Sequence, residues 1–369
     1  MNNLPNVTIC GCGSGGMAIA ADLAMMGCRV NLYETPRFRD NLEPIRANGG
    51  IDLTGLPFSG KTGLVKLHGI TDDAATALDG SEIVFINVPA MAVEPCLEHL
   101  APHFSQGQTV VVTTGYWASF RCRDLLKNTG AFDKYTFVEM VIMPYLSGKI
   151  GPAAVEIGNW KRELFIAAWP AAGNPAALEA IRKVYPQTQV CQNVIELNFR
   201  PGNPGVHVQI TLPRAAFFFE RAKIFRFYGE VSMCASKLTD AHDGERMQIA
   251  AAYDCITDTW PADCRRIYEL EGDNLYELHG SPSDRHAQKW NQIEEIERLL
   301  VEDICYSFIP MEELARVVGL STPVTSAMTD LTAVFTGYDY RANGLTLETL
   351  GLGGMSRDEI IEYAISGQK

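Results

Sequence analysis

The stretch VTICGCGSGGMAIAADLAMMGCRVNLYE, residues 7–34, holds four glycines within six residues. The apolar residues Val7–Cys10 in front of them are typical of a buried strand, and the alanine-rich segment behind them favours a helix. Gly27 is a typical helix end, and residues 29–34 are typical of a second strand. Strand, glycine turn, helix and strand thus follow one another within about thirty residues, the setting in which G-x-G-x-x-G has a physical meaning.

Each glycine of this pattern has a separate task. Gly11 allows a tight turn, Gly13 lets the backbone approach a pyrophosphate, and Gly16 lets the helix pack closely on the strand. The N-terminus of the helix offers free N–H groups and a partial positive charge to the phosphates. The pattern therefore predicts a Rossmann-type domain that binds a dinucleotide, and a glycine loop in an unrelated α/β domain is the alternative.

Glu34 ends the second strand at the position that contacts the ribose in such domains. Its carboxylate accepts hydrogen bonds from ribose hydroxyls and repels a 2′-phosphate, which favours NAD(H) over NADP(H). Arg37 and Arg39 follow and offer charge to a 2′-phosphate, so NADP(H) stays open. The predicted cofactor-binding residues are Gly11, Gly13, Ser14, Gly15, Gly16, Glu34, Val88 and Pro89.

Strand and helix patterns alternate through the first half of the chain. Apolar runs at 83–88, 109–113 and 137–143 predict buried strands. Helices are expected at 91–103, 118–127 and 175–185, a hairpin at 147–169 and a short strand around Val190. Such alternation predicts a doubly wound parallel sheet with helices on both faces, and ligands bind beyond the carboxyl ends of its strands.

The pattern changes near residue 190, and helical spacing dominates beyond the breaker-rich loop at 200–205. Pro310 is expected to end or interrupt a helical run. We therefore predict a dinucleotide-binding domain over 1–190, an all-helical domain over 191–369 and a cleft between them.

Composition limits the partners. The net charge is −13 and no basic stripe is visible, which argues against nucleic acid and against an anionic membrane surface. No apolar run approaches the roughly 20 residues of a membrane span, and the N-terminus lacks a signal-peptide pattern. The ten cysteines show no C-x-x-C and no zinc-like spacing. We expect reduced cysteines, a cytoplasmic protein and no metal site.

A dinucleotide supplies hydride, so the second half should supply a proton carrier. His207 follows the 200–205 loop, and an imidazole suits acid–base work, although a histidine beside apolar residues is often structural. The other histidines of this half, His242, His279 and His286, lie in polar stretches and are expected to be solvated.

Arg298 and Asp303 are the other candidates. An arginine is able to clamp a carboxylate, and an aspartate orients a histidine. The alternative is a solvated helix face. Five residues apart, the two side chains leave a regular helix about 140° from each other, so they would share a cleft only at a helix edge or after a deformation.

The chain resembles the opine dehydrogenases, the octopine/nopaline dehydrogenase family. The resemblance is carried by the glycine turn, by NPGVH at 203–207, and by the stretch from Arg298 to TLETLGLGG at 346–354. It implies a helical domain like the C-terminal domain of 6-phosphogluconate dehydrogenase. Members condense an amino acid with a 2-oxo acid, and NADH or NADPH reduces the imine to a secondary amine dicarboxylate.

The resemblance also implies roles for single residues. His207 matches the catalytic histidine and Asp303 its carboxylate partner. Arg298 matches the arginine that holds the 2-oxo acid, and Glu139 matches an acidic residue near the nicotinamide. Val208 stands where the family commonly has proline, Leu299 replaces an aromatic residue, and residues 278–292 fit poorly, which leaves the amino-acid partner open.

Two alternative functions remain open. A homodimer is possible as the assembly with each of them. A ketopantoate-reductase-like or glycerol-phosphate-dehydrogenase-like enzyme would use a lysine donor, but Lys223 and Lys237 lie in no matching motif. A non-catalytic NAD-binding protein would consume no NADH. The opine dehydrogenase assignment requires His207, Asp303 and Arg298 to converge above the nicotinamide. A residue 207 that is packed into the interior, or turned away from the cofactor, would leave the proton transfer without a carrier and the assignment would collapse.

Overall fold

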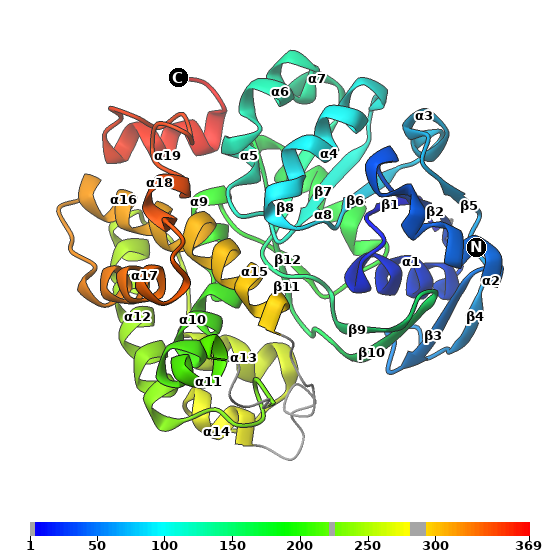
Figure 1. The fold of residues 1–369 in the computed structure, drawn as a ribbon. Coiled ribbons are helices and arrows are strands. Elements are labelled where there is room, and N and C mark those ends of the chain that lie inside the picture. Colours follow the sequence, from blue (N-terminus) through cyan, green and yellow to red (C-terminus); the bar gives the residue numbers. More distant parts are fainter. Residues whose placement is uncertain (1–3, 221–225, 281–292) are drawn as a thin grey trace. The chain divides into compact units, whose positions relative to one another are not determined.

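The computed structural model describes residues 4–220, 226–280 and 293–369 (Figure 1). It divides into two compact units. Unit 1 comprises Met1–Leu197 with Ile365–Gly367, and unit 2 comprises Asn198–Ala364 with the last two residues. Each unit has a hydrophobic core of its own.

An eight-stranded sheet organises unit 1. Its strands are β1 (Asn6–Cys10), β2 (Arg29–Tyr33), β5 (Gly69–Thr71), β6 (Ile83–Ile86), β7 (Thr109–Thr113), β8 (Thr136–Met140), β11 (Leu164–Ala168) and β12 (Thr188–Val190). The order is β12-β11-β8-β7-β6-β1-β2-β5, and all neighbours are parallel except β11 and β8. Strand β1 pairs with β2 on one side and with β6 on the other, so the strand order reverses at β1. The carboxyl end of β1 is therefore the topological switch point, where such sheets bind ligands. The predicted doubly wound sheet is confirmed.

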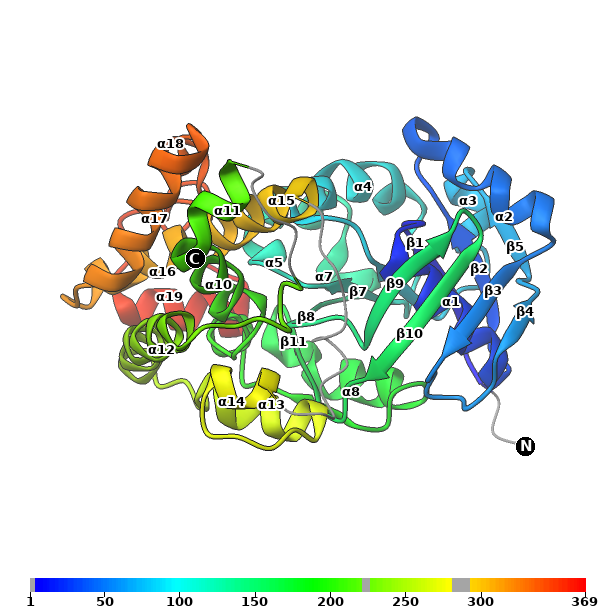
Figure 2. The same ribbon diagram turned by 60° about the horizontal axis from the view of Figure 1, so that its bottom comes forward.

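A second, four-stranded sheet in the order β4-β3-β10-β9 was not predicted. Its strands are β3 (Ile51–Gly55), β4 (Gly63–Val65), β9 (Tyr145–Gly151) and β10 (Ala154–Trp160) (Figure 2). The hairpin expected at 147–169 is correct for β9 and β10, which pair antiparallel. It is wrong for its last part, because Leu164–Ala168 leaves the hairpin and pairs with β8 in the larger sheet.

Helix α1 (Ser14–Met26) packs against strands of both sheets. Its alanine-rich face is fully buried, so small side chains allow close approach on both sides. Asp22 is fully buried on this helix and accepts hydrogen bonds from the backbone N–H groups of Phe58 and Ser59 and from the Tyr145 hydroxyl. This carboxylate ties α1, which follows the glycine turn, to the second sheet.

The remaining helices of unit 1 are short. They are α2 (Glu43–Asn48), α3 (Ala74–Leu78), α4 (Val93–Leu100), α5 (Ala118–Arg121), α6 (Arg123–Asn128), α7 (Ala131–Lys134), α8 (Asn174–Arg182) and α9 (Val194–Asn198), with 3₁₀ turns η1 (Pro36–Asn41), η2 (Ala90–Ala92), η3 (Ala101–His103) and η4 (Ala171–Gly173). The helix expected over 118–127 is broken at Cys122 into α5 and α6.

Helices build the second half of the chain, and no strand follows Val190 in the ranges described, which confirms the predicted all-helical domain. The helices are α10 (His207–Thr211), α11 (Ala215–Phe219), α12 (Met233–Ala252), α13 (Trp260–Tyr268), α14 (Leu275–Gly280), α15 (Ile293–Asp303), α16 (Ile309–Val317), α17 (Pro323–Thr336), α18 (Tyr340–Asn343) and α19 (Arg357–Ser366), with 3₁₀ turns η5 (Asn203–Gly205) and η6 (Leu212–Arg214). Among the described helices, none combines the length and apolarity needed to cross a bilayer.

A π-helical turn, η8 (Ile304–Phe308), joins α15 to α16. Pro310 lies in the first turn of α16, directly after the π turn, so the predicted interruption occurs just before it. The π turn begins directly after Asp303, one of the predicted site residues.

The prediction that His242 is solvated is wrong. On α12 this residue is 2% exposed, its Nδ1 lies 2.9 Å from the Thr325 hydroxyl, and its ring packs on Phe308. Burial, with a smaller effect from Arg246, lowers the pKa of His242 to about 3 because the charged ring would lose its water. His279 is also buried, at 5% exposed, and His286 lies outside the described residues.

We expect this buried histidine to make unit 2 sensitive to acid. Above the unfolded-state pKa of about 6.5, His242 is neutral in both the folded and the unfolded protein, and it costs no stability. Below it only the unfolded state takes up the proton until the pH nears 3, so stability falls as pH falls. Between pH 7 and 5 the wild type should lose about 2 kcal/mol more than His242→Gln in urea unfolding. The exposed His99→Gln is the control, and equal losses in all three proteins would contradict the prediction.

Candidate active site

The geometry of the glycine turn agrees with the task predicted for each glycine. Gly11 has a φ of 107°, and a Cβ there would overlap the carbonyl oxygen of Asn87. A Cβ at Gly16 would overlap the carbonyl oxygen of Gly11, so only glycine lets α1 begin this close to β1. Gly13, by contrast, is exposed, and a Cβ there would meet nothing within 4 Å. An open backbone at this position is what a bound pyrophosphate requires.

The other predicted residues of the turn lie around it. Ser14 is the first residue of α1, and a Cβ at buried Gly15 would overlap the sulfur of Met143. Val88 follows β6, and its side chain lies against Gly11, while Pro89 is exposed. The predicted cofactor-binding residues of this region thus follow β1 and β6 or begin α1, at the carboxyl ends of the two strands that flank the switch point.

Glu34 is fixed beside this turn. It is 6% exposed, and its carboxylate accepts from the backbone N–H of Cys12 at 3.0 Å and of Thr35 at 2.9 Å. Lys149 of β9 donates to the carbonyl of Cys12 at 3.5 Å, which places a cation beside the turn as well. Burial, together with the charge of Glu34, raises the pKa of the Cys12 thiol. The carboxylate is thus held in one orientation at the end of β2.

The loop after β7 is strained, which was not predicted. Thr114, Tyr116 and Trp117 all have positive φ, at 62°, 46° and 61°. Arg121 holds the loop by donating to the carbonyl of Tyr116 at 2.9 Å, and its guanidinium pairs with Glu94 at 2.8 Å. Such strain persists only where the surroundings enforce it, and it concentrates at functional sites. Here it lies at the carboxyl end of a central parallel strand.

Glu139 lies beneath this loop. It is fully buried on β8, its carboxylate accepts from the N–H of Ser119 at 2.8 Å, and a Cβ at Gly115 would overlap the same carboxylate. The structure thus gives Glu139 a role in holding the start of α5. Its contact with substrate stays a prediction.

His207 and Asp303 are brought together, as expected. Nδ1 of His207, at the start of α10, lies 2.8 Å from Oδ2 of Asp303, the fully buried last residue of α15. Nε2 lies 2.8 Å from the hydroxyl of Tyr228. His207 is only 3% exposed, so it is packed into the interior of unit 2. That burial counts against a direct transfer from this imidazole to a substrate in the conformation seen here.

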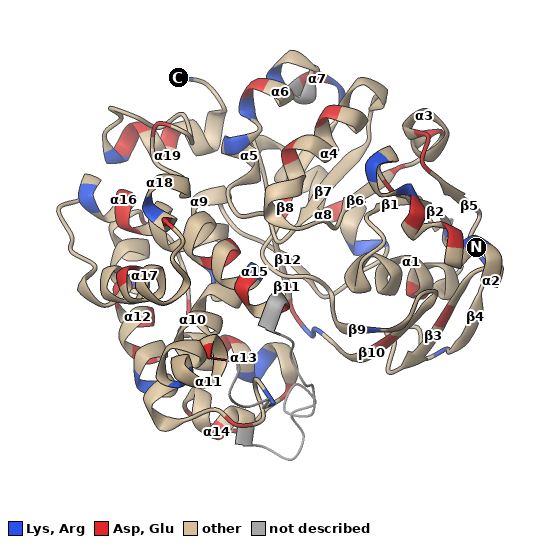
Figure 3. Cartoon of the chain, viewed as in Figure 1, with Lys and Arg blue, Asp and Glu red and all other residues tan. Residues whose placement is uncertain are grey.

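Arg298 is placed differently from the pair. Its guanidinium donates to Glu302 at 2.7 Å, and its side chain is 41% exposed on the acid-rich helix α15 (Figure 3). The helix is regular from Arg298 to Asp303 and deforms only afterwards, at η8. The two side chains therefore leave the axis about 140° apart, and the deformation considered above does not bring them together.

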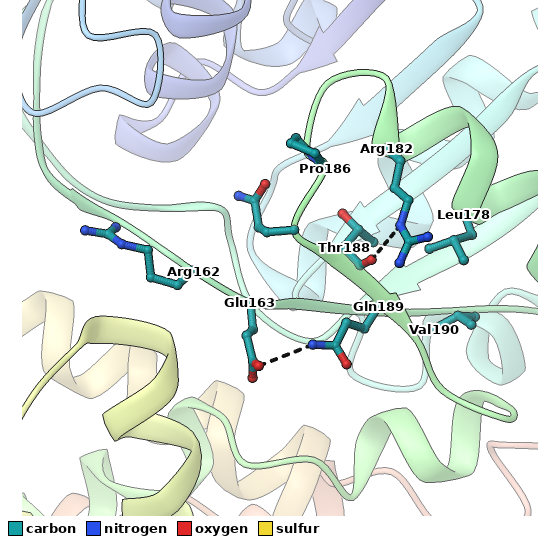
Figure 4. A pocket seen from close by; sticks show the side chains of 9 residues that line it. Arg162, Glu163, Leu178, Arg182, Pro186, Thr188, Gln189 and Val190 are labelled. Atoms are coloured by element: carbon teal, nitrogen blue, oxygen red, sulfur yellow. Dashed lines mark hydrogen bonds between the residues drawn. The ribbon is translucent and has the colours of Figure 1, made fainter.

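A hollow of about 500 Å³ lies elsewhere on unit 1 (Figure 4). Its lining is Arg162, Glu163, Leu178, Arg182, Pro186, Gln187, Thr188, Gln189 and Val190. Arg162 stacks on Trp160, and Arg182 donates to the carbonyl of Thr188. None of the predicted site residues lines this hollow.

Comparison with known proteins agrees with both halves. Residues 190–336 match the family described as the alpha-helical domain of NAD/NADP octopine/nopaline dehydrogenase, and residues 6–115 match the N-terminus of NAD-dependent glycerol-3-phosphate dehydrogenase. An opine dehydrogenase of Arthrobacter sp. (strain 1C) is 29% identical over 94% of this chain and 95% of its own.

Solved structures share the fold. An octopine dehydrogenase with NADH and L-arginine superposes with a TM-score of 0.73 at 18% identity, covering 99% of this chain and 98% of its own. A yersinopine dehydrogenase with bound NADP⁺ has a TM-score of 0.66 at 14% identity, with complete coverage of both chains.

The glycine turn at the switch point and the helical domain that matches NAD/NADP dehydrogenases define an NAD(P)-dependent oxidoreductase. Its nearly full-length similarity to an opine dehydrogenase and the family match over residues 190–336 specify the class further. Over residues 190–336 the chain matches the octopine/nopaline dehydrogenase family, and over nearly its whole length it is similar to an opine dehydrogenase.

Proposed function

We propose that this enzyme condenses the amino group of an amino acid with a 2-oxo acid and reduces the resulting imine, and that it runs the reverse oxidation. The observation that carries the proposal is the 2.8 Å hydrogen bond between His207 and Asp303, inside the stretch that matches the octopine/nopaline dehydrogenase helical domain. In this proposal residues 1–190 form the dinucleotide-binding domain and residues 191–369 the substrate domain.

The chemistry needs a proton at the imine nitrogen, because a protonated imine accepts hydride more readily. His207 supplies this proton, and Asp303 orients the ring and stabilises its charged form. Arg298 holds the 2-oxo acid through its carboxylate once it exchanges Glu302 for the substrate, and Glu139 stands on the nicotinamide side. The nicotinamide supplies the hydride when bound.

The test is a screen for NADH oxidation. Pyruvate, glyoxylate and 2-oxoglutarate are each paired with a panel of amino acids, and the panel is repeated with NADPH. Turnover that requires both substrates supports the proposal. Turnover of an oxo acid alone would favour the ketopantoate-reductase-like alternative, and no turnover with any pair would favour a non-catalytic NAD-binding protein. Of the two lysines considered for the ketopantoate-reductase-like alternative, Lys237 is exposed on α12 and Lys223 lies outside the described residues.

We propose NAD(H) rather than NADP(H) as the preferred cofactor, because the Glu34 carboxylate is held at the end of β2 by two backbone N–H groups. A fixed negative charge accepts from ribose hydroxyls and repels a 2′-phosphate. We further propose a cytoplasmic location, which the ten free cysteines support, and a homodimer as the assembly.

Changing Glu34 to Gln should shift the cofactor preference. Removing the charge removes the repulsion of a 2′-phosphate, so the ratio of kcat/KM for NADH over NADPH should fall about tenfold or more, on the order of 1.4 kcal/mol. Steady-state kinetics with both cofactors measure this ratio. Asp40→Asn removes an exposed charge six residues away and should leave the ratio unchanged. A ratio that moves equally in both variants would assign the effect to net charge instead of to Glu34.

A further inference from the structure

The burial of His207 raises the question of how its proton reaches a substrate. Both ring nitrogens are engaged, Nδ1 with Asp303 and Nε2 with the Tyr228 hydroxyl, each at 2.8 Å. A carboxylate oxygen only accepts, so Nδ1 carries the hydrogen of the first bond. Nε2 is then the nitrogen that gains or loses a proton, and its partner is a hydroxyl that both donates and accepts.

Tyr228 is less buried than the histidine behind it. His207 is 3% exposed, whereas Tyr228 is half-buried. The Tyr228 ring is held by aromatic neighbours on two sides, with Phe227 at 5.0 Å and His279 at 4.9 Å between ring centroids. Phe227 is fully buried and also packs against the His207 ring, at 5.8 Å. The hydroxyl is therefore fixed on the histidine by packing as well as by its hydrogen bond.

We propose that the Tyr228 hydroxyl is the group that passes the proton between His207 and the substrate nitrogen, an inference that rests on the proposed function. In the reductive direction the Tyr228 O–H gives its proton to the imine nitrogen. The Nε2–H of protonated His207 replaces that proton on the tyrosine oxygen. The imine gains one proton, the imidazolium becomes neutral imidazole, the hydroxyl is restored, and Asp303 stays a carboxylate. Oxidation of the product reverses each transfer.

Two features of the geometry favour this route. The 2.8 Å contact between Nε2 and the hydroxyl lies within the reach that proton transfer requires. In addition, the relay explains how a histidine enclosed in unit 2 remains usable, because the tyrosine extends its reach by one side chain. Asp303, His207 and Tyr228 then form a single line of hydrogen bonds from a buried carboxylate to the hydroxyl of a half-buried tyrosine.

The variant that tests the relay is Tyr228→Phe, which keeps the ring packing and removes only the hydroxyl. We expect kcat for the reductive reaction to fall about 100-fold, the lower end of what positioned proton transfer contributes, with the KM for NADH unchanged. Tyr276→Phe is the matched control, because it removes a hydroxyl from an exposed tyrosine on α14. A kcat within twofold of wild type in Tyr228→Phe, at an unchanged pH profile, would make Tyr228 a packing residue only and overturn the proposal.

A measurement on the wild type covers the case in which Tyr228→Phe does not fold. In the relay the two protons move together, from His207 to Tyr228 and from Tyr228 to the imine. The rate in mixtures of H₂O and D₂O should therefore follow a curved dependence on deuterium content, and a linear dependence would overturn the relay. Failure of the relay and failure of the proposed function remain distinguishable. An active wild type with an inactive His207→Ala and a fully active Tyr228→Phe rejects only the relay, whereas a wild type inactive with every substrate pair rejects the function itself.

Discussion

Replacing His207 with alanine is expected to lower kcat for reductive condensation by about 1000-fold and to leave the Kd of NADH unchanged. General acid–base catalysis by a positioned side chain contributes on the order of 10²–10⁴ to the rate. The predicted cofactor contacts belong to the glycine turn and Glu34, so removing an imidazole in unit 2 should not affect them. Stopped-flow or steady-state kinetics measure kcat, and titration of NADH fluorescence measures the Kd.

One further variant and a stability measurement help to interpret the result. Asp303→Asn keeps the size of the side chain but removes the charge that stabilises the imidazolium, so it should lose part of the rate, between wild type and His207→Ala. A melting curve on each variant separates loss of chemistry from loss of fold, since both residues are buried. A His207→Ala enzyme with more than a third of the wild-type kcat would remove His207 from the mechanism.

The glycine turn predicts a contrast between two substitutions of the same size. Gly16→Ala should destabilise the protein by about 1–3 kcal/mol and abolish NADH binding, because the new Cβ overlaps backbone that has little room to move. Gly13→Ala should change the free energy of unfolding by less than about 0.5 kcal/mol, because its Cβ meets nothing within 4 Å and its φ is −72°. It should still weaken NADH binding about tenfold or more, since the methyl group occupies the space assigned to the pyrophosphate.

Urea unfolding and NADH titration on the same two proteins test this contrast. Each variant is the other's control, because both add one methyl group to the same turn. An unchanged NADH affinity in Gly13→Ala would show that the dinucleotide does not lie against this backbone. A stable Gly16→Ala would show that the turn is able to shift.

Local patterns predicted most of unit 1, and long-range pairing explains the remainder. The G-x-G-x-x-G turn and the Val- and Ile-rich strands carry their own signals, because a strand buried on both faces is apolar throughout. In the second sheet only the β9–β10 hairpin carries a local signal. Its pairing with β3 does not, since β3 and β10 pair across about a hundred residues of chain and contain glycine and polar residues. The break after the hairpin at 147–169 was missed for the same reason, because only the partner strand β8 determines where β11 pairs.

The candidate site shows a similar division. The resemblance to the family pointed to His207 and Asp303, and the structure pairs them. The position of Tyr228 in the sequence does not distinguish it from other aromatic residues, so its contact with His207 is seen only in the three-dimensional structure. The burial of His242 has a signal in the sequence that the prediction of a solvated residue overlooks. Thr239, His242 and Arg246 recur at helical spacing, and all three are buried on one face of α12. Polar residues at that spacing signal a buried hydrogen-bonded face as readily as a solvated one.

The π turn after Asp303 makes the orientation of Asp303 depend more on the number of residues in the segment 304–308 than on their side chains. A π turn holds one residue more than the α-helix it interrupts. Deleting any single residue there would remove one residue's turn of the helix, so everything N-terminal to the deletion would rotate by about 100° relative to α16. Asp303 would then point away from His207 even though neither residue had changed, so this short segment should tolerate substitutions far better than insertions or deletions.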